Sequence, residues 1–434
     1  MTGVDDDALR REVRAWLAAN VVGEFAAAGA AGGPGSEHLF VDVRREWERV
    51  LGAAGWTCVG WPEIHGGRGL SLGQQVIFHE EYVRSGAPTR INVIGETLLG
   101  PTLIARGTPE QQARFLPAIR SGDELWCQGY SEPDAGSDLA NVKTSAVLVD
   151  GQWRVTGQKV WTSLATEADW CFVICRTEPG SVRHRGLSYL LVPMRQPGVE
   201  IRPIVQLTGT SEFNEVFFDG AATAADHVVG APGEGWAVAM ATLAFERGIS
   251  TLSVQLGFER EMAAIIALAR SNGSLDSPVV RDRIVRAWGG LRIMRWIALR
   301  GLAGHEAGTP GPEASVAKLY WANWHRDLGN LGIDVAGPGG LVGDALPYEL
   351  TAPQRAFLFS RSDTIYGGSN EIQRNLIGER VLGLPADPKL AEPKVAAAKV
   401  AAAKNAGAEK AGAENAGVAG GDVEPKTAEA KAAG

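Results

Sequence analysis

The chain has 434 residues, of which 45% are hydrophobic and 21% are charged, proportions typical of a soluble globular protein with a large buried core. Its formal net charge of −8 argues against nucleic acid as a main partner, because nucleic-acid-binding surfaces are usually basic. No apolar run is long enough to span a membrane and the acidic first residues do not resemble a signal peptide, so we expect a cytoplasmic protein.

Residues 1–121 are predicted to form a mainly helical N-terminal domain. Apolar residues recur at helical spacing over residues 5–28, which predicts a first amphipathic helix. Ser71 is a predicted N-cap for a later helix that carries Val76 and Ile77. The pair Gly100-Pro101 is predicted to break the helical region that follows, because proline cannot donate a backbone hydrogen bond.

Residues 122–231 change to the pattern of a small β domain, in sandwich or barrel form. Short β-rich runs alternate there with Gly, Pro, Asp and Asn, and Asp150-Gly151 is the signal of a type I′ hairpin turn. Cys171 and Cys175 lie in the apolar run DWCFVICR, which predicts a buried strand. No histidine pair accompanies the cysteines, so we expect no metal site.

Residues 232–385 are predicted to return to helices, packed as an antiparallel four-helix bundle. We expect Trp288, Trp321 and Trp324 to lie in the bundle core. The segment Val335–Gly340 is predicted to be a glycine-rich loop, and no strand leads into it, which argues against a nicotinamide-binding Rossmann unit. Residues 386–434 contain almost only Ala, Lys, Glu and Gly with scattered valines, so we expect a disordered tail.

The stretch from Trp126 to Ser163 joins a polar loop to a predicted hairpin. Small and hydroxyl-bearing residues crowd into Ser131–Asp138, where backbone N–H groups can approach a ligand closely. The hairpin that follows ends in aromatic residues, including Trp161. This combination suits a flat cofactor with a polar edge, although an ordinary hairpin would explain the spacing equally well.

Three signatures give this chain a family resemblance that extends from about Trp47 to Pro385. The segments Ser131–Asp138 and Gly157–Ser163, the tryptophan-proline-Gly-Gly stretch Trp61–Gly67, and the segment Tyr366–Arg374 resemble motifs of the acyl-CoA dehydrogenases. The resemblance implies an α+β fold with a helical domain, a β domain and a C-terminal bundle. It also implies an oxidoreductase of lipid metabolism that acts on CH–CH groups with FAD.

The resemblance further implies partners for this flavoprotein. The substrate would be a thioester of CoA or of an acyl-carrier protein, and an electron-transfer flavoprotein would receive the electrons. A homodimer or homotetramer is expected, because the family builds its FAD site from two subunits, and a hetero-oligomer stays open. A flavin oxidase or monooxygenase on the same fold is the enzymatic alternative.

The chain departs from the family at the position of the usual catalytic base. Gly367 stands where most members have a glutamate, so that carboxylate is missing. Phe245-Glu246-Arg247 matches the Glu-Arg pair that supplies the base in the isovaleryl-CoA dehydrogenase type, and Glu246 lies in an apolar run. We therefore expect Glu246 to remove the α-proton. There are two alternatives. Glu246 and Arg247 could be an ordinary surface pair, or the chain could be a base-deficient subunit, because mixed assemblies occur in an actinobacterial branch of the family with a similar motif.

The remaining site residues follow from the resemblance alone. Ser replaces the family's Thr at positions 131 and 163, which keeps the hydroxyl, and Gly367 leaves room for a bulky acyl group. The matched FAD-binding positions are Gln128, Tyr130, Ser131, Trp161, Thr162, Ser163, Arg270, Val335, Ala336, Gly337, Ser369 and Glu371. The matched substrate-binding positions are Ser137, Arg247, Tyr366 and Gly367.

Overall fold

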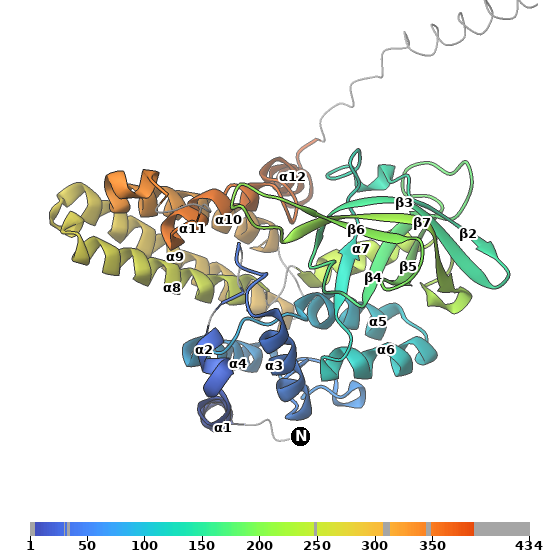
Figure 1. Ribbon diagram of the computed structural model, residues 1–434, viewed down its shortest axis with the longest axis horizontal. Coiled ribbons are helices and arrows are strands. Elements are labelled where there is room, and N and C mark those ends of the chain that lie inside the picture. Colours follow the sequence, from blue (N-terminus) through green and yellow to red (C-terminus); the bar gives the residue numbers. More distant parts are fainter. Residues whose placement is uncertain are drawn as a thin grey trace, which may run out of the picture. The chain divides into compact units, whose positions relative to one another are not determined.

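The computed structural model describes residues 5–29, 31–32, 35–246, 250–306, 313–343 and 349–385. Within these ranges the backbone alone is described for residues 246, 250–254, 302–306 and 313–315. The chain forms a helical N-terminal part, a central β-sheet part and a helical C-terminal part, which confirms the predicted fold class (Figure 1). The expected domain boundaries stay predictions, and the tail 386–434 lies outside the described residues.

The N-terminal part differs from the sequence-based prediction at two points. The helix predicted over residues 5–28 is interrupted near Val21, where one helix ends and a short one begins. The predicted break at Gly100-Pro101 was wrong, because a π-helical turn, Gly95–Leu99, runs directly into the next α-helix. The Ser71 cap is confirmed as a capping box with Gln74. The helices are α1 (Asp6–Asn20), α2 (Gly23–Ala28), α3 (Val41–Ala53), α4 (Leu72–Ser85), α5 (Gly100–Arg106) and α6 (Pro109–Ser121).

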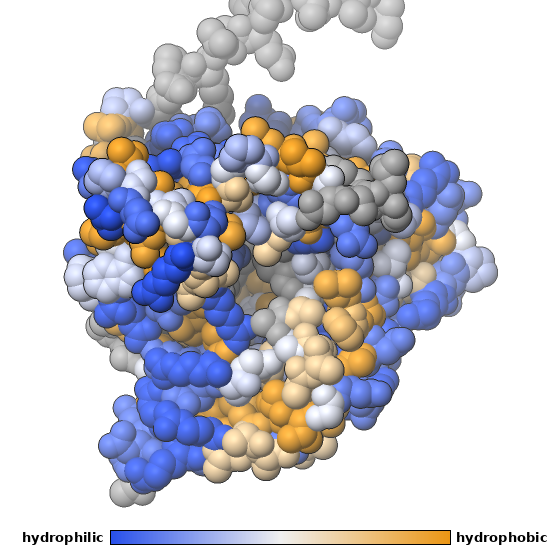
Figure 2. Space-filling view, turned by 60° about the vertical axis from the view of Figure 1, so that its left-hand side comes forward, coloured by the Kyte–Doolittle hydropathy of each residue, from blue (hydrophilic) through white to orange (hydrophobic). Residues whose placement is uncertain are grey.

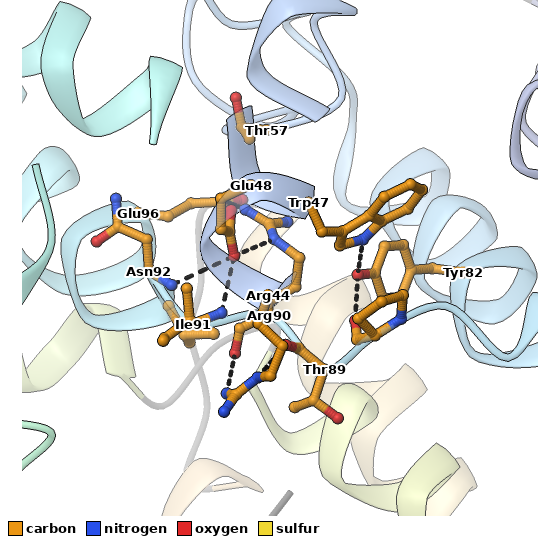
Figure 3. Close-up of polar contacts among 12 residues, drawn as sticks. Arg44, Trp47, Glu48, Thr57, Tyr82, Thr89, Arg90, Ile91, Asn92 and Glu96 are labelled. Carbon is orange, nitrogen blue, oxygen red and sulfur yellow. Dashed lines mark hydrogen bonds and ion pairs between the residues drawn. The ribbon is translucent and has the colours of Figure 1, made fainter. Parts of the chain in front are cut away.

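Buried charged groups hold the N-terminal helices together (Figure 3). Glu48 Oε1 accepts hydrogen bonds from Arg90 Nε and from the Ile91 backbone N–H, each at 2.8 Å, and Arg90 also pairs with Glu96. Removing one partner of such a buried pair leaves the other charge uncompensated, which is costly. The network therefore fixes the segment at residues 90–92 between α3 and the π-helical turn.

The central part is an eight-stranded sheet with strand order β6-β7-β3-β2-β4-β5-β8, and β1 pairs with β4 in parallel (Figure 1). Asp150 and Gly151 have φ angles of 51° and 74°, which confirms the type I′ turn between β2 and β3. The cysteines of β4 are fully buried, as predicted. The strands are β1 (Trp126–Gly129), β2 (Ser145–Val149), β3 (Gln152–Ser163), β4 (Trp170–Arg176), β5 (Leu187–Pro193), β6 (Val199–Ile204), β7 (Phe213–Ala224) and β8 (Val228–Val229).

The C-terminal part packs three long helices around a common apolar core, with Trp321 buried in it and Trp324 packed against it. Trp288 was predicted to lie in this core, but 55% of its surface is exposed, so that prediction was wrong. None of the described helices is long and apolar enough to cross a membrane. The helices are α7 (Gly235–Glu246), α8 (Ser250–Ser271), α9 (Pro278–Glu306), α10 (Glu313–Ala336), α11 (Ala352–Phe359) and α12 (Asn370–Leu376).

Candidate functional site

A β-bulge in β3 exposes Trp161. The register of β3 against β7 shifts between Lys159 and Thr162, so two residues of β3 oppose one residue of β7. Trp161 has a φ of 60°, which is unusual for a bulky residue, and 57% of its surface is exposed. Its ring meets that of Phe213 edge-on at 6.3 Å between centroids. The bulge therefore turns a flat aromatic side chain outward beside the polar loop.

The polar loop lies directly against this bulge. Gln128 is on β1, Tyr130 and Ser131 follow it, and the Val160 backbone N–H donates to the Ser131 carbonyl at 2.9 Å. Ser131 and Ser163 are both partly exposed. The structure thus brings six of the predicted cofactor-binding residues to one place, since Thr162 lies between Trp161 and Ser163. Ser137, the predicted CoA contact, is exposed in the same loop.

A buried ion pair holds the loop in this position. Lys159 is fully buried, and its ammonium donates to Glu132 Oε1 at 2.8 Å, to the Tyr130 carbonyl at 3.0 Å and to the Ile174 carbonyl at 2.7 Å. These three bonds use all three donors of the ammonium. Burial disfavours the Glu132 carboxylate, but Lys159 outweighs it and keeps the pKa of Glu132 below its usual value.

The motifs alone do not predict this ion pair, although Glu132 lies in the segment Ser131–Asp138 and Lys159 in the segment Gly157–Ser163. A signal for the pair is nevertheless present in the sequence. Lys159 is in step with Trp153 and Val155, the apolar positions of its strand that face the core, and a charged residue at such a position usually has a buried partner.

Thr162 offers a hydroxyl that the described residues leave unpaired. Its side chain is fully buried, its carbonyl accepts from Asn214 Nδ2 at 3.0 Å, and its Oγ1 has no hydrogen-bond partner within the described ranges. Buried hydroxyls in folded proteins are normally hydrogen-bonded. An exposed indole beside two serines and an unpaired threonine hydroxyl therefore fits a flat heteroaromatic ring with polar edges, such as the isoalloxazine of a flavin.

The segment from Tyr366 to Glu371 is a glycine turn that leads into α12. Gly367 and Gly368 have φ angles of 62° and 88°, in the left-handed region that favours glycine. The Gln373 side chain donates to the Gly367 carbonyl at 3.3 Å, and Ser369 caps α12 by accepting from the Ile372 N–H. Glu371 is exposed in the first turn of α12. The turn thus presents backbone groups rather than a carboxylate at position 367.

Three of the matched FAD-binding residues, Val335, Ala336 and Gly337, lie at the end of α10 or directly after it, and Arg270 lies in the last turn of α8. Asn272, just after Arg270, donates through Nδ2 to the Val335 carbonyl at 2.7 Å. The predicted loop was wrong in part, because Val335 and Ala336 belong to the last turn of α10 and Val335 is buried in the bundle core. Trp321, which packs beside Tyr366 at 6.2 Å between ring centroids, precedes Val335 by 14 residues, or roughly 20 Å along the helix. This chain therefore does not unite Arg270, Val335, Ala336 and Gly337 with the Tyr366 turn.

Glu246 is the last residue of α7, and its side chain is not among those described, while Arg247 lies outside the described residues. The helix is anchored one turn earlier, where the hydroxyl of Thr242 lies 2.9 Å from that of Thr102 and 3.5 Å from that of Tyr189. The rings of Tyr189 and Tyr130 meet edge-on at 6.4 Å. The backbone of α7 thus ends near Tyr189, whose ring packs against that of Tyr130, the residue directly before Ser131.

The chain matches three domain families along its length. Residues 4–123, 127–221 and 233–382 match, in order, the N-terminal, middle and C-terminal domains of acyl-CoA dehydrogenase. Acyl-CoA dehydrogenase IpdE1 of Mycobacterium tuberculosis is 61% identical over 386 residues, which cover 89% of this chain and 99% of that relative. IpdE1 of Mycolicibacterium smegmatis is 58% identical over 390 residues, which cover 88% and 98%.

Solved structures whose titles name two components share the fold. A structure titled Tcur3481-Tcur3483 steroid ACAD has a TM-score of 0.76 and 29% identity, covering 88% of this chain and 98% of that chain. The ChsE4-ChsE5 complex from Mycobacterium tuberculosis has a TM-score of 0.73 and 30% identity, covering 89% and 99%. The chain therefore belongs to the acyl-CoA dehydrogenase family and is an oxidoreductase of that family.

Proposed function

We propose that this protein catalyses the FAD-dependent α,β-dehydrogenation of an acyl-CoA thioester. The observation that carries the proposal is the Trp161 bulge, which places an exposed indole beside the Ser131 loop and the unpaired Thr162 hydroxyl. Bound FAD would supply the hydride acceptor for the β-carbon. Trp161 would flank its ring, while the hydroxyls of Ser131 and Ser163 would donate to its polar edge.

Two further groups of this chain would act on the thioester itself. The Gly367 N–H would hold the thioester oxygen as negative charge develops there, a contact that strengthens in the transition state. Glu246 would remove the α-proton, because position 367 has no carboxylate to do so. This assignment is supported by the position of the α7 backbone near Tyr130, through Thr242 and Tyr189.

We further propose that the acyl group is bulky and contains fused rings. A glycine at 367 leaves the space that a glutamate side chain would fill, and one structurally similar assembly is titled a steroid ACAD. The carrier would be CoA, reached by the exposed loop at Ser137.

Anaerobic reduction of the bound flavin by a panel of thioesters tests this function. We expect polycyclic acyl-CoAs to bleach the flavin at least about tenfold faster than butyryl-, octanoyl- or palmitoyl-CoA, because discrimination by pocket shape is worth one to a few kcal/mol. The matching acyl-carrier-protein thioesters serve as the carrier control. Faster bleaching by the straight chains would contradict the substrate class, and rapid reoxidation of the reduced flavin by air would favour an oxidase over a dehydrogenase that uses an electron-transfer flavoprotein.

A second candidate is supported by the absence of a carboxylate at Gly367. In that case the chain would be a base-deficient subunit that binds FAD in a hetero-oligomer and relies on its partner chain for turnover. Separation of Val335, Ala336 and Gly337 from the Tyr366 turn supports an oligomer of either kind, because a second chain must then complete the FAD site.

An exposed apolar face of α9 is a candidate for the subunit contact. On the face drawn in Figure 2, hydrophobic side chains are exposed among hydrophilic ones. Helical spacing puts four exposed side chains on one side of α9, namely Val285, Trp288, Trp296 and Leu299. Large exposed tryptophans are typical anchors of protein interfaces.

Replacing Trp296 by glutamate should therefore weaken assembly. Loss of a buried tryptophan anchor costs about 2 kcal/mol or more, which is about a 30-fold higher dissociation constant. Sedimentation velocity over a dilution series measures the change. Val279→Glu is the matched control, because Val279 is exposed on the same helix but lies on another side. An unchanged mass distribution for Trp296→Glu would exclude this face from the assembly.

A further inference from the structure

A buried histidine on α10 lies between two carboxylates. His325 Nδ1 is 2.5 Å from Asp363 Oδ2, and His325 Nε2 is 2.7 Å from Glu261 Oε2 on α8. Only 4% of the histidine surface and 1% of the Asp363 surface are exposed. Ionised carboxylate oxygens accept hydrogen bonds and cannot donate them, so both ring nitrogens must donate. The geometry is that of an imidazolium ion held from both sides.

The hydrogen bonds continue from this ion to the glycine turn. The Tyr366 hydroxyl donates to Asp363 Oδ1 at 2.6 Å, and the Lys318 ammonium donates to the Asp363 carbonyl. Tyr366 is the residue directly before Gly367. A continuous path thus runs from Glu261 through His325 and Asp363 to Tyr366, which we call the α8–turn relay.

The Tyr366 ring is also fixed on its faces and at its base. It packs beside Trp321, and the Lys318 ammonium lies 4.6 Å from the Trp321 ring and 5.4 Å from the Tyr366 ring. Gln373 holds the Gly367 carbonyl at 3.3 Å. The hydrogen bond to Asp363 therefore restrains the Tyr366 hydroxyl, while packing against Trp321 restrains the plane of its ring.

We infer that His325 is a positioning residue, which acts through Asp363 and Tyr366 to aim the Gly367 N–H at the thioester oxygen. This inference rests on the proposed function. Preorganised backbone donors contribute to catalysis only where they are held in place, and a shift of about 1 Å in such a donor can cost about 100-fold in rate. The relay thus connects a residue on α10 to the glycine turn by hydrogen bonds through Asp363.

The charges around His325 favour its protonated form. Phe258 of α8 stacks on the ring at 4.2 Å, while Glu261 and Asp363 face its two nitrogens. Lys318 donates to the Asp363 backbone carbonyl, and the Arg361 guanidinium is close enough to feel the charge of Asp363. Burial by itself lowers the pKa of His325, but the hydrogen bonds to Asp363 and Glu261 outweigh it and raise this pKa to about 9.

The first test compares four variants of the assembled, FAD-loaded protein. Tyr366→Phe keeps the ring and removes only the hydroxyl, whereas His325→Gln can serve one carboxylate but not both. Each should lower kcat about 10- to 100-fold with KM changed less than about threefold, since the lost contact acts in the transition state. The double variant should be no slower than the slower single variant, because both break the same path. The matched control is Tyr320→Phe. Tyr320 lies on α10, like His325, and its hydroxyl donates to the Gly290 carbonyl of α9, so removing it should leave kcat unchanged.

The relay would be overturned if the reductions in kcat of the two single variants multiplied in the double variant. It would also be overturned if Tyr320→Phe lost as much kcat as Tyr366→Phe.

The second test needs no substrate. Because the pKa of folded His325 is raised, its stabilising contribution is complete below about pH 6.5 and is lost as the pH rises through about 9. The melting temperature of the wild type should fall over this window, and His325→Gln should not show that fall.

The two tests separate failure of the inference from failure of the proposed function. If no thioester reduces the flavin, the proposed function fails, and so does the role of His325 in aiming the Gly367 N–H. The dependence of the melting temperature on pH still shows whether the His325 ring is positively charged. If thioesters are turned over but the wild type and His325→Gln share one melting profile across pH 6.5–9, the relay is wrong and the proposed function stands.

Discussion

Glu246→Gln should slow reduction of the bound flavin by an acyl-CoA about 10²- to 10⁴-fold, the range expected when a general base is removed. Glutamine matches glutamate in size, so substrate binding should change little while proton removal stops. Stopped-flow absorbance under anaerobic conditions measures the reduction rate, and the same samples give the flavin content. We expect the Glu246→Gln variant to retain its bound flavin and to lose most of its rate of flavin reduction.

Glu110→Gln is the matched control for this substitution. Glu110 is exposed in the first turn of α6, in the helical N-terminal part of the chain, so its change to glutamine should leave the reduction rate within about twofold. An unchanged rate in Glu246→Gln would contradict the assignment of the base. The search would then move to a carboxylate of the partner chain in a hetero-oligomer, which is the second candidate function above.

Lys159→Met should destabilise the fold by about 3–5 kcal/mol and empty the flavin site, because it leaves the Glu132 carboxylate buried without its cation. Glu132 also accepts from the backbone N–H groups of Lys143 and Thr144, at 2.6 and 2.9 Å. These bonds alone do not neutralise its charge. Urea unfolding gives the stability change, and flavin absorbance after gel filtration gives the cofactor content.

Lys143→Met controls for the loss of a lysine in the same region. Lys143 pairs with Asp134 at 2.8 Å, but both side chains are about 70% exposed, so this pair should contribute less than about 1 kcal/mol. The double variant Lys159→Met/Glu132→Met should recover part of the lost stability, since it removes both buried charges. Equal stability losses for Lys159→Met and Lys143→Met would show that the buried pair does not hold the loop.

Features set by neighbouring residues could be predicted from the sequence. The Ser71 cap and the Asp150-Gly151 turn depend on side chains and φ angles within a few positions, and both are confirmed. The order of helical, sheet and helical parts is confirmed for the same reason, because local periodicity differs between them. The loop and strand that form the candidate flavin platform were also identified, from the motif segments around Ser131 and Trp161.

Features set by distant contacts could not be predicted. Pro101 continues a helical path because a π-helical turn precedes it, and Trp288 is exposed because α9 turns another side to its neighbours. The outward direction of Trp161 depends on a register shift against β7, which the sequence of β3 alone does not contain. His325 is 64 residues from Glu261 and 38 from Asp363, so no local spacing pointed to the relay.

All four cysteines are buried, so labelling of these natural thiols can be used to measure local opening of the structure. Cys58 lies beside the N-terminal helices and the other three lie in β1 and β4, and each is free and at most 1% exposed. A thiol reagent can react only when the surrounding structure opens, so the labelling rate measures the frequency of that opening. Mass spectrometry of the labelled peptides would then tell whether removing the cofactor loosens the sheet around Cys127 and Cys171 while the helices around Cys58 stay closed.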